Sequence, residues 1–278
     1  MESKGIDVSN YQGKIDWAKV KADGVTFVII RAGWGKTNVD PMFRTYIEGA
    51  ISQGLGIGVY WFLYAKNEND IILNAKKCQE TIEPYRSKIN LKVWADWEYD
   101  SDKYKPGLSK AQRTAWVKKF LETMSGYGYN VGIYANPDYL KNKFNDVSEY
   151  PLWLAYYATS KGKYDPFMWQ YSSKGRVNGI VSVVDMDICY GDKAPNSAQP
   201  APQKKYPTLQ KGSTGEYVKL LQSILNEKGY NCGKVDGKFG PKTKAAVEKF
   251  QSENVDANGV KLQKDGIVGP KTWSALTK

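Results

Sequence analysis

The sequence has 278 residues, of which 41% are hydrophobic and 25% charged, with a net charge of +11, and this composition is typical of a globular protein. It contains no histidine, which excludes catalytic triads with a histidine base and zinc sites built on histidine ligands. It also lacks a run of about 18 apolar residues, so we expect no membrane span.

Short apolar runs in the first two thirds of the chain predict eight strands. Runs of this character are typical of parallel strands that are covered on both faces. In chain order, the predicted strands are 5–10, 26–34, 56–64, 91–98, 130–136, 151–157, 167–172 and 181–190.

Amphipathic stretches between the early strands predict helices at 14–23, 41–53, 68–83 and 109–125, with a short helix near 137–144. The fourth helix opens on a capping box of Ser109 and Gln112, and Gly126 is expected to end it. After the fifth strand the connections are too short for full crossover helices. The pattern therefore predicts an α/β fold, an irregular (β/α)8 TIM-like barrel.

A proline-rich stretch separates this barrel from the rest of the chain. The sequence GDKAPNSAQPAPQKKYP at 191–207 is typical of an extended spacer. We therefore expect a barrel over 1–192, a linker over 193–206 and a second domain over 207–278. Residues 194–278 carry 14 Lys and Arg against 7 Asp and Glu, which indicates a basic domain that would suit a polyanion.

The second domain contains an internal repeat. VDGKFGPKTKAAVEKFQ at 235–251 and KDGIVGPKTWSAL at 264–276 share Asp-Gly-x-x-Gly-Pro-Lys-Thr. Asp-Gly predicts a tight turn with glycine at positive φ, and Pro241 and Pro270 stand where helices should begin. Together with LQKGSTGEYVKLLQSILNEKGY in front, the repeat predicts a small three-helix all-α domain.

Acidic residues recur in the predicted strands of the barrel, at Asp7, Asp96, Glu98, Asp185 and Asp187. In (β/α)8 barrels the active site lies at the C-terminal ends of the strands, so we expect these acids to surround one mouth. Acids two positions apart on a strand share a face at about 6.6–6.8 Å. Such a pair fits glycosidic bond cleavage, in which one acid protonates the leaving oxygen. A salt-bridged or magnesium-binding acidic cluster is the alternative.

The surroundings of Glu98 should raise the pKa of one acid of this set. Crowding by Asp96 and Asp7 and apolar walls formed by Trp94 and Trp97 would have this effect. A raised pKa is what a general acid needs near neutral pH.

Aromatic residues at predicted strand ends are candidate sugar-binding groups, because their flat faces suit sugar rings. Gln170, between Trp169 and Tyr171, is the polar residue that we expect to bind a sugar substituent. The aromatic candidates are Tyr60, Trp61, Tyr134, Trp153 and Trp169.

These residues together resemble the glycoside hydrolase family 25 lysozymes, the muramidases of phage endolysins and bacterial autolysins. The matching stretches cover nearly all of residues 4–190 in the order of the family. They are GIDVSNYQG, FVIIRAGWG, GVYWFLYA, the D-W-E of VWADWE, GIYANPDYL, LWLAYYA, MWQYSS and VVDMD.

The resemblance implies cleavage of the β-1,4 bond between N-acetylmuramic acid and N-acetylglucosamine in peptidoglycan, without a metal or cofactor. It assigns Glu98 as general acid and Asp96 as the carboxylate that assists the substrate's acetamido group, with Asp7 and Asp185 completing the acidic cluster. Two positions depart from the family. Trp61 stands where histidine is frequent, and Asp187 stands where asparagine is more frequent, which makes Asp187 a weaker candidate.

The tail resembles the three-helix peptidoglycan-binding domains of wall hydrolases, which implies bacterial peptidoglycan as its partner. Its basic charge would favour anionic wall polymers as well, whereas it carries no recognised nucleic-acid module. The N-terminus lacks the pattern of a secretory signal. We therefore expect a protein that acts on the bacterial wall and is made in the cytoplasm and released, or one whose leader was removed.

Two other functions remain open at this stage. A chitinase or N-acetylglucosaminidase would also place D-x-E at a strand end, although the longer D-G-x-D-x-D-x-E run is absent here. A non-catalytic wall-binding protein is the second alternative, but a pure binder does not need the acidic set.

Overall fold

The computed structural model describes residues 2–190, 206–256 and 259–277. The chain divides into two compact units, Met1–Gln203 and Lys204–Lys278, and each unit is described by itself. The predicted linker at 193–206 lies outside the described residues, except for Tyr206.

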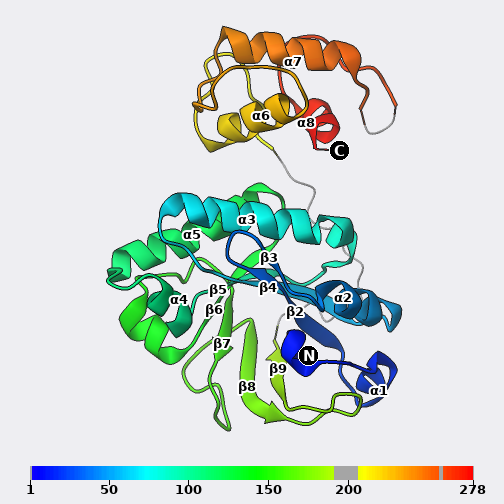
Figure 1. Cartoon of the computed structure of the whole chain (residues 1–278), viewed down its shortest axis with the longest axis vertical. Coiled ribbons are helices and arrows are strands. Elements are labelled where there is room, and N and C mark those ends of the chain that lie inside the picture. Colours follow the sequence, from blue (N-terminus) through cyan, green and yellow to red (C-terminus); the bar gives the residue numbers. More distant parts are fainter. Residues whose placement is uncertain (1, 191–205, 257–258, 278) are drawn as a thin grey trace. The chain divides into compact units, whose positions relative to one another are not determined.

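Eight strands of the first unit close into a barrel (Figure 1). They are β1 (Ser3–Val8), β2 (Phe27–Trp34), β4 (Gly56–Phe62), β5 (Val93–Asp96), β6 (Val131–Ala135), β7 (Leu152–Ala155), β8 (Met168–Gly175) and β9 (Val184–Cys189). Pairing is parallel from β1 through β2, β4, β5, β6 and β7 to β8. A ninth strand, β3 (Asn38–Val39), pairs antiparallel with the end of β2. The predicted irregular eight-stranded barrel is confirmed.

The last strand corrects the expectation of parallel strands. β9 runs antiparallel to both of its neighbours, β8 and β1. The connection before it spans only residues 176–183, which is too short for the crossover that a parallel strand needs. Its first residues therefore lie at the edge of the barrel where the other strands end.

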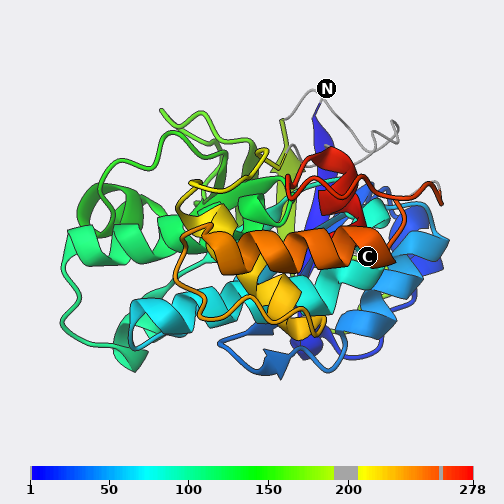
Figure 2. The ribbon, with the colours of Figure 1, turned by 90° about the horizontal axis from the view of Figure 1, so that it is seen from above.

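Helices cover one flank of the barrel. The long helices α2 (Phe43–Ser52), α3 (Glu68–Ile82) and α5 (Lys110–Gly126) pack against β2, β4, β5 and β6, and α3 and α5 lie side by side (Figure 2). The shorter elements are η1 (Asn10–Gln12), α1 (Trp17–Ala22), η2 (Glu83–Lys88), α4 (Tyr99–Tyr104) and the single π-helical turn η3 (Tyr139–Lys143). None of the described helices combines the length and apolar character needed to cross a membrane.

The predicted start of α5 is confirmed, because Ser109 and Gln112 exchange hydrogen bonds. The backbone N–H of Gln112 donates to Ser109 Oγ at 3.2 Å, and that of Ser109 donates to Gln112 Oε1 at 3.0 Å. Gly126 is the last residue of the helix, but the glycine with positive φ is Gly128, two residues later (φ 84°).

Inward-facing glycines make room for large side chains inside the barrel. A Cβ at Gly132 would lie 2.3 Å from the Trp94 ring, so only glycine fits beside this tryptophan. The next inward position on each strand comes two residues later, because side chains alternate across a strand. On β6 that position is Tyr134, and on β5 the position above Trp94 is Asp96. On these two strands, the inward residue directly above the apolar floor is therefore polar and lies at the mouth of the barrel. The floor consists of Phe27, Ile29, Leu91, Trp94, Trp153, Met168 and Cys189.

The second unit contains the three predicted helices, α6 (Glu216–Glu227), α7 (Pro241–Glu253) and α8 (Pro270–Leu276). Both Asp-Gly turns place glycine at positive φ, 73° at Gly237 and 70° at Gly266. A buried glutamine holds each turn, since Gln222 accepts a hydrogen bond from the N–H of Gly237, and Gln251 from that of Gly266, each at 2.9 Å. Each amide also donates to the aspartate before the glycine and to the threonine near the start of the next helix. The sequence repeat is therefore a structural repeat.

Candidate active site

Five carboxyl groups gather at the mouth of the barrel. Asp7 lies near the end of β1, Asp96 ends β5, and Glu98 follows it in extended backbone at the start of α4. Because β9 is antiparallel, Asp185 near its beginning lies opposite Asp7 in the strand register. Asp187 lies two residues deeper on β9. The structure thus brings the four predicted catalytic residues together, with Asp187 beneath them.

Asp96 and Glu98 form a carboxyl pair with hydrogen-bond contact between their side chains. The side chain of Asp96 is 4% exposed, and its Oδ1 accepts no hydrogen bond from any N–H or hydroxyl group in the described part of the chain. Burial and the charge of Glu98 raise the pKa of Asp96 well above its ordinary value. Such a pair holds one proton between its two groups, because two neighbouring charges cannot both be kept in a buried site.

Glu98 lies nearer to solvent than Asp96 and is only half-buried. Burial and the negative charge of Asp100 raise the pKa of Glu98 to about 7. A carboxyl group with this pKa is protonated in an appreciable fraction of molecules at neutral pH, as a proton donor must be.

Arg31 on β2 supplies a positive charge beside the pair. Its charge opposes the rise in the pKa of Asp96, so it favours the ionised form of that residue. The Arg31 Nε atom lies 2.7 Å from Asp40 Oδ2, and the guanidinium lies over the rings of Tyr11 and Trp34. In the described ranges, none of the five mouth carboxyls forms an ion pair with lysine or arginine. The salt-bridged alternative is therefore not supported.

Gln170 connects Asp7 to the tyrosines of the mouth. Its Nε2 donates to Asp7 Oδ2 at 2.7 Å. Its Oε1 accepts from the hydroxyls of Tyr134 at 3.0 Å and Tyr157 at 3.1 Å. The amide therefore has a fixed orientation and holds Asp7 from one side.

The aromatic candidates divide according to strand alternation. Tyr60, Tyr134 and Trp153 face the barrel interior, where Trp153 packs in the floor and donates its Nε1–H to Asp187. Trp61 points outward, is 0% exposed and donates its Nε1–H to the Gly35 carbonyl. Its placement does not support the predicted sugar contact.

Two other tryptophans also point away from the mouth. Trp169 lies between the inward residues Met168 and Gln170, and donates its Nε1–H to the Tyr156 carbonyl at 2.7 Å. Trp97 packs against Trp116 on α5. Trp169 is thus not placed to bind substrate, and Trp97 is not a wall of the carboxyl site as predicted.

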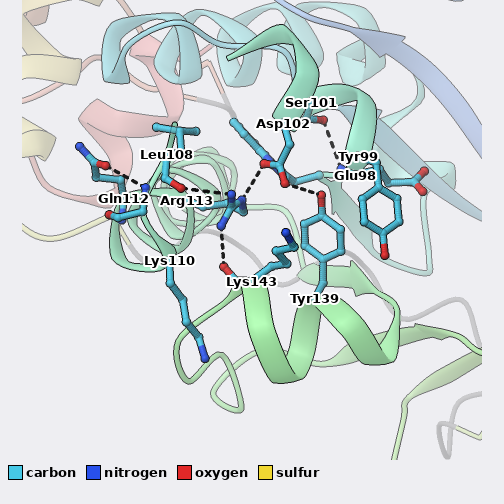
Figure 3. Close-up of polar contacts among 12 residues, drawn as sticks. Glu98, Tyr99, Ser101, Asp102, Leu108, Lys110, Gln112, Arg113, Tyr139 and Lys143 are labelled. Carbon is cyan, nitrogen blue, oxygen red and sulfur yellow. Dashed lines mark hydrogen bonds and ion pairs between the residues drawn. The ribbon is translucent and has the colours of Figure 1, made fainter. Parts of the chain in front are cut away.

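Residues that the sequence analysis did not select hold α4, the helix that begins directly after Glu98. Asp102 accepts hydrogen bonds from Arg113 Nε at 2.7 Å, from Trp97 Nε1 at 2.9 Å and from the Tyr139 hydroxyl at 2.9 Å. Arg113 also donates to the carbonyls of Lys143 and Leu108. The Glu98 carboxyl points away from this network (Figure 3).

The Asp102 network therefore fixes the backbone on which Glu98 stands while leaving its carboxyl free to face the mouth. At the start of the helix, the backbone N–H of Glu98 donates to Ser101 Oγ at 3.2 Å. Although burial acts against it, the hydrogen bonds from Arg113, Trp97 and Tyr139 lower the pKa of Asp102. Sequence offered no signal for Asp102 or Arg113, because both look like ordinary helix-surface charges.

Comparison with known proteins gives matches for both units. The family model "Glycosyl hydrolases family 25" matches residues 6–180, and that of a peptidoglycan binding domain matches residues 214–276. An autolytic lysozyme from Clostridium acetobutylicum is 32% identical over 258 residues, which cover 90% of this chain and 72% of the relative. Lysozyme M1 from Streptomyces globisporus is 27% identical over 202 residues, which cover 69% of each chain.

A solved structure is similar to the barrel unit. The modular autolysin LytC from Streptococcus pneumoniae, determined in complex with a synthetic peptidoglycan ligand, gives a TM-score of 0.62 at 28% identity. The match covers 68% of this chain and 47% of that chain.

Replacing Asp102 with asparagine should destabilise the barrel, because Arg113 would be left buried without its charged partner. We expect Asp102→Asn to lower the free energy of unfolding by about 2–3 kcal/mol at pH 7. The lowered pKa of Asp102 means that its stabilisation is present above about pH 4 and is lost on acidification through its folded pKa, so the difference from wild type should shrink at low pH. Denaturant unfolding at several pH values measures this.

The matched control is Asp100→Asn on the same helix, whose partner Lys103 is exposed. It should change stability by less than about 0.5 kcal/mol. Equal losses in the two variants would contradict the role given to the Asp102 network.

Proposed function

The chain belongs to glycosyl hydrolase family 25, and we propose that Glu98 and Asp96 carry the catalytic step of its peptidoglycan-cleaving reaction. The activity is that of a lysozyme, or muramidase, acting on bacterial peptidoglycan. The observation that carries the assignment is the Asp96–Glu98 pair at the barrel mouth, together with a pKa of about 7 at the more accessible member.

The bond cleaved is the β-1,4 bond between N-acetylmuramic acid and N-acetylglucosamine. Glu98 donates its proton to the glycosidic oxygen as the bond from that oxygen to the anomeric carbon breaks. The substrate's acetamido oxygen attacks the anomeric carbon and forms a cyclic oxazolinium ion, so no covalent bond to the protein is needed. The ionised Glu98 then takes a proton from water, which opens the ring and releases the sugar.

Asp96 stabilises the charge that develops in this step. After Glu98 has used the shared proton, Asp96 is an ionised acceptor for the acetamido N–H, and its negative charge offsets the positive charge of the oxazolinium ion. The charge of Arg31 opposes the raised pKa of Asp96 and so favours the state in which Asp96 is ionised and the proton of the pair is on Glu98.

The other mouth residues bind and orient the sugar. Asp7 and Asp185 complete the acidic rim, while Tyr60, Tyr134 and Gln170 offer ring faces and polar atoms beside it. Trp153 lies in the apolar floor beneath them. These roles need no metal or cofactor.

The second unit is a peptidoglycan-binding domain. We infer that it also binds anionic wall polymers, because it carries a large excess of lysine and most of these side chains are exposed. Attachment to the wall would raise the concentration of the barrel near its substrate. Exposed charges of this kind are screened by salt, which provides a test.

Glu98→Gln should abolish wall lysis, because glutamine keeps the shape of the side chain but cannot donate a carboxyl proton. We expect the clearing rate of cell-wall suspensions to fall by about 100- to 10,000-fold, the contribution of a positioned general acid. Glu122→Gln on α5 is the control and should retain wild-type activity. A Glu98→Gln protein that clears walls at the wild-type rate would refute the assignment.

The new reducing end of digested peptidoglycan separates this function from the two alternatives. A reducing N-acetylmuramic acid is the expected product, whereas N-acetylglucosamine would indicate a glucosaminidase. Intact walls would indicate a binding protein without activity.

The pH profile should report the titration of Glu98. Because Glu98 must be protonated, kcat/KM should fall as the pH rises through about 7. Asp100→Asn removes a negative charge that raises the pKa of Glu98, so the alkaline limb should move to lower pH by roughly 0.2–0.7 units, as for an exposed interaction. An unchanged limb would show that another group controls the profile.

Wall binding by the full chain should depend on anionic polymers. Using the inactive Glu98→Gln protein, we expect co-sedimentation with bacterial walls to weaken as salt rises from 0.05 to about 0.5 M. Walls stripped of their anionic polymers should bind less protein at low salt and lose the salt dependence. Equal binding to stripped and intact walls would refute the inference about polymers while leaving peptidoglycan binding in place.

A further inference from the structure

A second carboxyl pair joins Asp7 to Asp187, and Asp187 takes part in none of the reaction steps described above. Asp187 on β9 is 0% exposed, and in the strand register it lies between Gly5 of β1 and Gln170 of β8. Its side chain is in hydrogen-bond contact with that of Asp7. A fully buried acid beside another acid needs a physical explanation.

The two oxygens of Asp187 have different surroundings. Oδ1 accepts the Nε1–H of Trp153 at 2.8 Å. Oδ2 receives no hydrogen bond from any N–H or hydroxyl group of the residues that the structure describes, so Asp7 is the partner left to it. On its other side, Asp7 already accepts a hydrogen bond from Gln170.

Among the residues that the structure describes, no lysine or arginine forms an ion pair with either acid of this second pair. The titratable groups around it are acids and tyrosines, and none of these is positively charged near neutral pH. They are Asp185 on β9, Tyr60 on β4, Tyr134 on β6, Tyr157 after β7 and Tyr171 on β8. Two bare carboxylates in contact would repel each other strongly in such a poorly solvated place. One proton between them removes the repulsion and supplies the missing hydrogen bond.

We propose that Asp187 is a positioning residue that shares one proton with Asp7, and that this proton holds Asp7 and Gln170 in place at the mouth. The inference rests on the proposed function for its effect on activity. Asp187 then has a role that neither the general acid Glu98 nor the assisting carboxylate Asp96 performs.

The hydrogen bonds then form a continuous chain across five strands. Trp153 on β7 holds Asp187, Asp187 shares its proton with Asp7 on β1, and Asp7 is held by Gln170 on β8, which Tyr134 on β6 orients. Loss of the shared proton would place two negative charges together and break this chain at its centre.

The titration behaviour of the pair agrees with the geometry. Burial raises the pKa of Asp187 to about 8, and burial together with the charge of Asp187 raises the pKa of Asp7 well above its ordinary value. These titrations belong to the pair, since one proton serves both groups. The pair should keep its proton at neutral pH and lose it under alkaline conditions.

Asp187→Asn is the decisive variant, because an amide can accept from Trp153 and donate to Asp7 without titrating. In the wild type, kcat/KM for soluble peptidoglycan fragments should fall about tenfold per pH unit above pH 7, where Glu98 loses its proton, and more steeply at still higher pH, where the Asp7–Asp187 pair loses the proton that it shares. In Asp187→Asn the second, steeper fall should disappear, with activity at pH 6 close to wild type. An Asp187→Asn protein with the same steep fall would overturn the proposal.

Asp187→Ala tests the hydrogen bond itself. Of the side-chain donors to Asp7 in the described part of the chain, only Gln170 then remains, and we expect kcat/KM at pH 6 to fall by about 10- to 100-fold, as for loss of a hydrogen bond to a charged group. Wild-type activity in this variant would overturn the positioning role. Asp187→Asn keeps the test valid if the alanine variant does not fold.

The thermal stability of the barrel gives a readout that does not depend on activity. A carboxyl with a raised pKa in the folded state binds a proton that the unfolded chain has released, so stability falls as the pH rises from about 4 towards 8. The melting temperature of Asp187→Asn should therefore exceed that of wild type by an amount that grows over this range. A constant difference would overturn the proposal, even if Glu98→Gln had already refuted the catalytic assignment.

Discussion

The removal of carboxyl groups from water at the mouth of a closed barrel determines the chemistry of this protein. Asp7, Asp96 and Asp187 are buried, and none of them pairs with a lysine or arginine among the described residues. In place of a cation, a proton then reduces the negative charge of each pair, and each pair of acids retains one proton. The reactivity of Glu98 follows from this constraint, because it shares a proton with a buried neighbour and can pass it to a substrate.

The barrel produces this burial through simple alternation along its strands. Glycines and large apolar residues fill the floor, and the inward residue above it is polar on β1, β5, β6 and β8, at Asp7, Asp96, Tyr134 and Gln170. Closure by the antiparallel β9 brings Asp185 and Asp187 to Asp7, although almost the whole domain separates them in sequence. A small buried network around Asp102 then fixes α4 and with it the backbone of Glu98.

Much of this arrangement could be predicted from sequence, because two-residue periodicity shows which side chains share a face. It placed Asp96 with Glu98 and located the eight barrel strands, and the repeated Asp-Gly turns indicated the three-helix tail. It could not give the direction of β9, which depends on the length of one connection. It also could not separate inward from outward tryptophans, since Trp61 and Trp169 look like sugar-binding residues until the register is known. Arg31 and Asp102 act through tertiary contacts that leave no local pattern.

The proposed chemistry depends on one proton that the Asp96–Glu98 pair holds near neutral pH. Neutron diffraction from deuterated crystals grown near pH 6 would locate that proton directly. One deuteron is expected between the two carboxyl groups, within hydrogen-bond contact of both. Nuclear density with no deuteron on either group, or with Glu98 turned out of the mouth, would contradict it.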